Sequence, residues 1–176
     1  LSQACAWSGL LRESLAANEA ALRDITQIDQ FDRDYLGLDP ERWMLWMRAR
    51  VLIRMLQLDE ARACLQQILE RNAAKEDPLI RQIVYHLDVE IAWCVSDVAM
   101  SREYSRLSAQ VAQNYPSPYL RVLALWTAGL AAMVARDFEH ATNSFSDALA
   151  VIRAARIGAD IEAEVLACVA ENQHLS

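Results

Sequence analysis

Apolar residues recur every three or four positions along most of the chain, which is the spacing of one face of an α-helix. The clearest stretch is residues 118–155, PYLRVLALWTAGLAAMVARDFEHATNSFSDALAVIRAA. It predicts two amphipathic helices that meet at a polar break, Arg136-Asp137. Because such a pair cannot bury its apolar faces alone, the pattern indicates neighbouring pairs of the same kind.

The rest of the chain repeats this pattern and predicts an all-α fold with about nine helices. Gly and Pro number four each, which is too few to interrupt long helices, and the commonest residues are good helix formers. Polar breaks divide the pattern into helix pairs, and the clearest breaker is Tyr115-Pro116-Ser117-Pro118. We place the units at about 1–29, 40–73, 78–114 and 118–155, with a partial unit at 159–174, all within a single domain, 1–176.

Charge argues against nucleic acid as a direct ligand. The net charge is -7 and the pI is near 5.0, whereas a protein that binds phosphates needs a basic face. The chain also shows no signal peptide, and no apolar run approaches the roughly 20 residues that span a bilayer. We therefore expect a cytoplasmic protein with no membrane partner. Because the chain lacks an initiator Met, we expect it to be an excised piece of a longer one.

Candidate chemistry is sparse, and no catalytic residue, metal site or cofactor is predicted. The four cysteines stand far apart without a CxxC pair, which favours buried apolar side chains in a reducing compartment. His86 and Glu90 stand one helical turn apart, but no third ligand accompanies them, so an i,i+4 surface pair is favoured over a metal site. The phosphate-loop, GxSxG, HExxH and GxGxxG motifs are absent. The chain is therefore not expected to be an enzyme.

Residues 30–40, QFDRDYLGLDP, are the longest loop-like segment. Its three aspartates invite comparison with a calcium loop, but they lack the alternating ligands and the closing Glu of that motif. A solvated connection is favoured instead. It leads into a helix with Asp39 as its N-cap and Pro40 as its first residue.

Small residues stand at corresponding places in successive helix pairs. In the second helices they are Ser14, Ala61 and Ala141, with Tyr104 taking that place in the third pair. Twelve positions before Ala61, Tyr104 and Ala141, in the first helices, stand Ala49, Ala92 and Gly129. This regular distance of twelve indicates a repeated unit.

These residues resemble the tetratricopeptide repeat, a helix–turn–helix unit of about 34 residues with fixed small positions. The fourth unit matches through Gly129, Ala141, Phe145 and Ala148, and the second through Ala49, Ala61 and Leu65. Successive second-helix positions are 47, 43 and 37 residues apart (14 to 61, 61 to 104, 104 to 141). The resemblance is therefore to the longer, divergent repeats of large bacterial regulators, such as the maltose-regulon activator class and ATPase- or cyclase-linked regulators.

The resemblance implies a right-handed superhelix of antiparallel helix pairs, an α-solenoid whose first helices line a concave face. The residues expected on that face are Trp43, Trp46, Arg50, Arg54, His86, Val89, Trp93, Leu123, Trp126 and Leu130. One hypothesis is a partly apolar groove in which Arg50, Arg54 and His86 receive an acidic group. The alternative is that the tryptophans pack between neighbouring helices.

The expected function is that of a protein–protein interaction or regulatory scaffold domain in a bacterial signalling protein or transcriptional regulator. Its partner would be another protein or an adjoining domain of the same chain. A different class of function is a sensor for a small-molecule effector, as the resemblance to maltose-type activators implies. A third is an oligomerisation module, forming a homodimer through the uncapped ends of the repeat.

Overall fold

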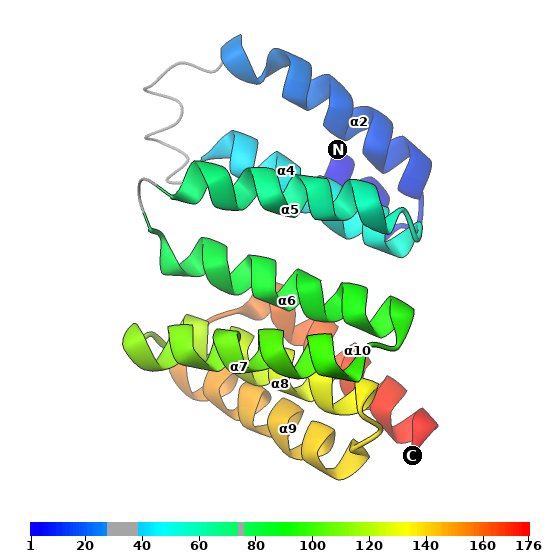
Figure 1. Ribbon diagram of the computed structural model, residues 1–176. Helices are drawn as coiled ribbons and strands as arrows, with labels where there is room; N and C mark the ends of the chain where they lie inside the picture. The colour runs from blue at the N-terminus through cyan, green and yellow to red at the C-terminus, as the bar shows by residue number, and fades with distance from the viewer. Residues whose placement is uncertain (28–38, 74–75) are drawn as a thin grey trace. The chain divides into compact units, whose positions relative to one another are not determined.

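The computed structural model describes residues 1–27, 39–73 and 76–176 (Figure 1). In these ranges it contains nine α-helices, one short 3-10 helix and no strand, which confirms the all-α prediction. The helices are α1 (Ser2–Trp7), α2 (Leu11–Asp24), η1 (Ile25–Gln27), α4 (Pro40–Arg54), α5 (Leu58–Asn72), α6 (Pro78–Val95), α7 (Val98–Asn114), α8 (Pro118–Val134), α9 (Phe138–Ala155) and α10 (Ala159–Leu175). No helix among them is long and apolar enough to cross a membrane.

Contacts divide the chain into two compact units, Leu1–Lys75 and Glu76–Ser176. In the first unit, α2 packs on both α1 and α4, α1 touches α4, and α5 packs on α4. In the second, α7 packs on α6 and α8, while α9 packs on α8 and α10. The helices α6, α8 and α10 also touch in succession. The same arrangement therefore occurs in both units. The second helix of each pair (α2, α5, α7 or α9) packs on the first helix of its own pair. In addition, α2, α7 and α9 pack on the first helix of the next pair, which is α4, α8 and α10 respectively.

Aspartate caps begin four of the helices. Asp39, Asp77, Asp97 and Asp137 precede α4, α6, α7 and α9, and each carboxylate accepts a hydrogen bond from an amide in the first turn. At α4 the Asp39 Oδ1 atom accepts from the amides of Glu41 (3.1 Å) and Arg42 (3.4 Å). The predicted cap at Asp39 followed by Pro40 is confirmed. The other aspartates of the 30–40 segment lie outside the described residues.

Each helix pair closes through the same left-handed turn. The turn residues, Gly9, Leu56, Ser96 and Arg136, have φ between 55° and 76°, and they stand 47, 40 and 40 residues apart. After each one, the next amide donates to the carbonyl five residues earlier, as Asp97 N does to Ala92 O at 2.9 Å. This is the pattern of a helix C-terminus that ends in a Schellman motif. Three of the four positions hold a residue with a Cβ, so glycine is not needed to form the turn.

The position five residues after each left-handed residue is fully buried. It is occupied by Ser14, Ala61, Ser101 and Ala141, each of which is 0% exposed. The third pair therefore differs from the prediction, because Ser101 occupies the place that the sequence assigned to Tyr104. The residue twelve positions before Ser101 is Val89 rather than Ala92. The N-caps show the correspondence, because Asp97 precedes α7 as Asp137 precedes α9, which places Ser101 opposite Ala141.

Small residues at these positions let two helices approach closely. In the first pair, Ser2 Oγ donates to the Ser14 carbonyl (3.0 Å) and Ser14 Oγ donates to the Ser2 carbonyl (2.8 Å). In the fourth pair, Gly129 lies against the ring of Phe145, where an added Cβ would overlap the ring. Ala49 and Ala61 are both 0% exposed in the second pair. The first and fourth pairs therefore depend on close approach of two helices at one level.

The left-handed turns give a prediction about stability. A residue with a Cβ is strained at positive φ by about 1–2 kcal/mol, and glycine relieves that strain while adding entropy to the unfolded chain. We expect Leu56→Gly and Ser96→Gly to raise the free energy of unfolding by about 0.5–1 kcal/mol in urea denaturation. The control Gln67→Gly, at an exposed site inside α5, should lower it by about 1 kcal/mol. If Leu56→Gly lowered the free energy of unfolding as much as the control does, the left-handed conformation of Leu56 would be contradicted.

Candidate functional site

The first candidate site is an aromatic and basic cluster on α4. The rings of Trp43 and Trp46 lie 4.4 Å apart, and both are half-buried against the apolar residues Ala6, Met47 and Val51. The Arg50 guanidinium carbon lies 5.3 Å from the centroid of the Trp46 ring, a cation–π contact.

The side chains of this cluster differ in how far solvent reaches them. Arg50 is only 7% exposed, whereas Arg54, one turn further along α4, is exposed. Trp43 and Trp46 still present part of their rings to solvent. Trp43, Trp46 and Arg50 are therefore in contact on α4, and Arg54 is the most accessible of the four residues that the sequence predicted there for a binding face.

The second candidate site is centred on His86, which the structure buries. His86 is 5% exposed, and its ring lies 4.1 Å from that of Trp126. The Thr127 hydroxyl donates to the Leu123 carbonyl (2.7 Å), so it accepts from His86 Nδ1 at 3.0 Å. His86 Nε2 faces the Glu90 carboxylate at 3.5 Å and has no hydrogen-bond partner among the described residues. The expectation of a surface pair was wrong for the histidine, which lies between α6 and α8.

Trp126 extends this cluster to α10. It is 4% exposed, and its indole N–H donates to Cys168 Sγ at 3.4 Å. His86, Trp126 and Cys168 thus connect the three first helices of the second unit, α6, α8 and α10. The burial of Trp126 favours the alternative in which the tryptophans pack between helices. His86 already has a carboxylate neighbour within the chain, Glu90. A histidine in this position has no open path to an acidic group of a ligand.

The remaining predicted binding residues divide between core and periphery. Val89 is 0% exposed and Leu123 is 5% exposed, so neither is accessible to a ligand. Val89 instead occupies the helix-contact position of the third pair. Trp93 and Leu130 are half-buried at the edge of the core of the second unit. In this unit only those two of the predicted binding residues retain appreciable accessible surface.

The residues predicted to pack the repeat lie in the helix interfaces. Six of them are 0% exposed: Ala49, Ala61, Ala92, Ala141, Phe145 and Ala148. The seventh, Gly129, is buried against Phe145. Ala92 has a different role from Ala49 and Gly129, since its carbonyl accepts the closing bond of the turn at Ser96. No group of three or more His, Cys, Asp or Glu side chains in the described ranges is arranged to hold a metal ion.

Sequence reasoning missed several polar residues in the helix interfaces. Gln82 on α6 is 0% exposed. With its side-chain oxygen turned to accept from the Ser108 hydroxyl of α7 and the Ala124 amide of α8, it bridges three helices. Asn18 donates from α2 to the Met44 carbonyl of α4 at 2.8 Å. Apolar periodicity gives no signal for such residues, because polar side chains are normally assigned to the solvent face.

The cysteines give a prediction for this region. Burial raises the pKa of the Cys168 thiol to about 11, and the carboxylates of Glu90, Glu171 and Glu164 add to that increase. Since the thiolate is the nucleophile, Cys168 should be almost unreactive near pH 7.5. Mass spectrometry after iodoacetamide treatment should find the exposed Cys94 modified well before Cys168, with the difference lost in urea. Equal rates in the folded chain would contradict the buried Trp126–Cys168 contact.

No protein-family model, curated protein or solved structure matches the chain. The chain's own geometry offers three distinctive features: the repeated helix pair, the α4 cluster and the buried contacts of the second unit.

Proposed function

We propose that the chain is a tetratricopeptide-like helical repeat that serves as a protein-binding and regulatory module. The observation that carries this proposal is the recurrence of one helix–turn–helix unit. Four pairs share a left-handed turn at the same place and a fully buried residue five positions later. Repeat units of this kind contact only their neighbours, and stacking them creates an extended concave surface for a partner.

The helix contacts support a superhelical arrangement of the pairs. In both compact units first helices touch first helices, while second helices pack between successive first helices. Continued along a chain, this pattern would be compatible with the right-handed superhelix that the resemblance implies. Its first helices would line the inner face and present their outward side chains to a ligand. Small shifts between neighbouring pairs would then couple partner binding to an adjoining domain.

The surface we propose for the partner is the α4 cluster of Trp43, Trp46 and Arg54. Tryptophan and arginine are the residue types most enriched in binding hot spots. The two rings already pack against a core, so their position is fixed before binding and little entropy is lost there. Arg54 adds an exposed positive charge on the same helix, roughly two turns beyond Trp46. A partner segment with apolar and acidic side chains would complement this surface, in a regulator of the bacterial signalling or transcription type.

Two other functions have an observation in their favour. A sensor for a small effector is favoured by a pocket of about 610 Å³ in the second unit. Self-association is favoured by exposed apolar side chains in α1 and α10, namely Trp7 at 61% and Leu166 at 44% exposure. Concentration-dependent sedimentation would favour self-association, and a shift of tryptophan fluorescence with a metabolite would favour the sensor.

The partner surface is tested by charge reversal in capture experiments. We expect Arg54→Glu to reduce at least tenfold the amount of specific partner that the immobilised chain retains from a bacterial extract, as for a hot-spot residue. The matched control, Arg23→Glu, reverses an exposed charge on α2 and should leave retention unchanged. Both variants should melt like the original chain. Equal retention by both, or no protein retained above background, would contradict the proposal.

A further inference from the structure

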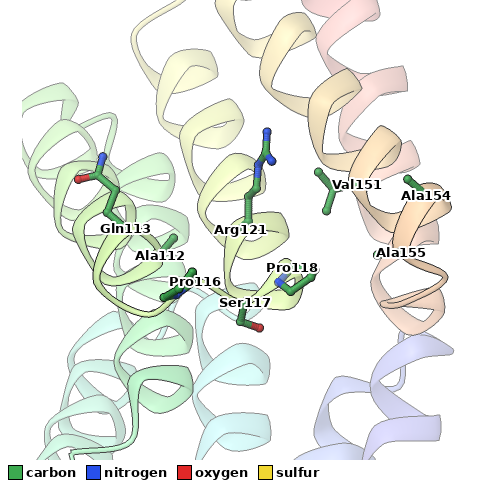
Figure 2. Close-up of a pocket in the computed structure, with 9 residues that line it drawn as sticks. All are labelled: Ala112, Gln113, Pro116, Ser117, Pro118, Arg121, Val151, Ala154 and Ala155. Carbon is green, nitrogen blue, oxygen red and sulfur yellow. The ribbon is translucent and has the colours of Figure 1, made fainter.

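A pocket of about 610 Å³ lies at one end of the second unit, outside the α4 cluster and the His86 contacts. Figure 2 shows its walls, which are the last turns of α7 and α9, and its base, which is the start of α8. The helix ends that face the pocket carry Ala112 on α7 and Ala154 and Ala155 on α9. Because these side chains are small, they leave space that larger residues would fill.

The apolar part of the pocket would hold a compact hydrocarbon group. Its lining combines alanine methyl groups with Val151, Pro116 and Pro118. Pockets that bind small molecules have volumes of about 300–1,000 Å³, mostly apolar walls and a few polar groups. This pocket matches in volume and lining, and it is an open groove, since Pro116, Pro118, Ala154 and Ala155 are exposed to solvent. The two prolines fix the backbone of the α7–α8 connection, since each ring restricts φ. This wall of the pocket is therefore formed before any ligand arrives.

All three polar side chains that line the pocket can donate hydrogen bonds. They are Gln113 at the end of α7, Ser117 in the connection and Arg121 one turn into α8. None of the three has a side-chain hydrogen bond or ion pair with another residue of the described ranges. No Asp or Glu lines the pocket. It therefore presents donors and one full positive charge, with no acidic group to neutralise that charge.

This combination identifies the chemistry of the ligand. A guanidinium group binds a carboxylate through two parallel hydrogen bonds. A phosphate is a poorer match, because the pocket holds a single cation and the whole chain carries a net charge of -7. We propose that the pocket binds a small monocarboxylic acid, with the carboxylate on Arg121 and the apolar body against Val151, Ala154 and Ala155.

Calorimetric titration with matched ligands tests this site. The probes are octanoate and 3-phenylpropionate, and their controls are the amine and the alcohol with the same apolar body. We expect saturable binding of the carboxylates in or below the millimolar range, and weaker or no binding of the matched amines and alcohols. Arg121→Gln should weaken carboxylate binding about tenfold or more, the usual effect of removing a charge-assisted hydrogen bond. The control Arg102→Gln, which removes an exposed charge of α7 away from the pocket, should leave the affinity unchanged.

A second pair of variants tests the apolar wall. Ala154→Trp should fill the pocket and abolish binding, whereas Ala150→Trp, on the same helix outside the pocket, should preserve it. The proposal is overturned if neither carboxylate binds saturably, if the amines bind as well as the acids, or if Arg102→Gln weakens binding as much as Arg121→Gln. Partner capture through α4 is unaffected by these outcomes, so the two proposals fail separately.

Discussion

Close approach of two helices at one small residue is the constraint on which the rest of the structure depends. Helices of 6 to 18 residues are marginal alone in water, so each one needs a partner to bury its apolar face. Gly129 against Phe145 and Ser2 against Ser14 show two chemical solutions to the same geometric demand. In one the backbone approaches an aromatic ring, and in the other two hydroxyl groups satisfy the facing carbonyls. The left-handed turn fixes where along the helices this contact falls.

Polar residues inside the helix interfaces specify which helices pack together. A buried polar group costs free energy unless it is hydrogen-bonded, so each such residue favours one partner over others. Gln82 favours α7 and α8, His86 favours α8, and Asn172 donates from α10 to the Phe138 carbonyl of α9 at 3.0 Å. In the second unit, contacts of this kind occupy much of the face that the first helices share. Of the residues predicted for the binding face, Trp43, Trp46 and Arg54 on α4 keep accessible surface, as does Trp93 on α6.

The sequence was informative about local structure and less so about which faces are occupied. Helix starts such as Asp39-Pro40 follow from the chemistry of caps, and apolar spacing predicts the helices themselves. The turns at Leu56 and Ser96 carry no glycine, so nothing in the residue type marks a positive φ. Apolar periodicity also cannot show how many neighbours a helix has. Trp126 and His86 were therefore predicted to line a groove, whereas contacts between α6, α8 and α10 bury them. The pocket beside Arg121 was missed because it depends on small residues at helix ends about forty positions apart.

A double-mutant cycle at Gly129 and Phe145 tests the central claim most directly. Alanine is the better helix former by about 1 kcal/mol, so Gly129→Ala would stabilise α8 if the site were open. We predict that it destabilises the chain by about 1–3 kcal/mol, because the added methyl group overlaps the Phe145 ring. Phe145→Leu should then remove most of that loss, giving a coupling energy of at least about 1 kcal/mol in urea unfolding. Additive effects, or a stabilising Gly129→Ala, would show that the two helices do not meet there.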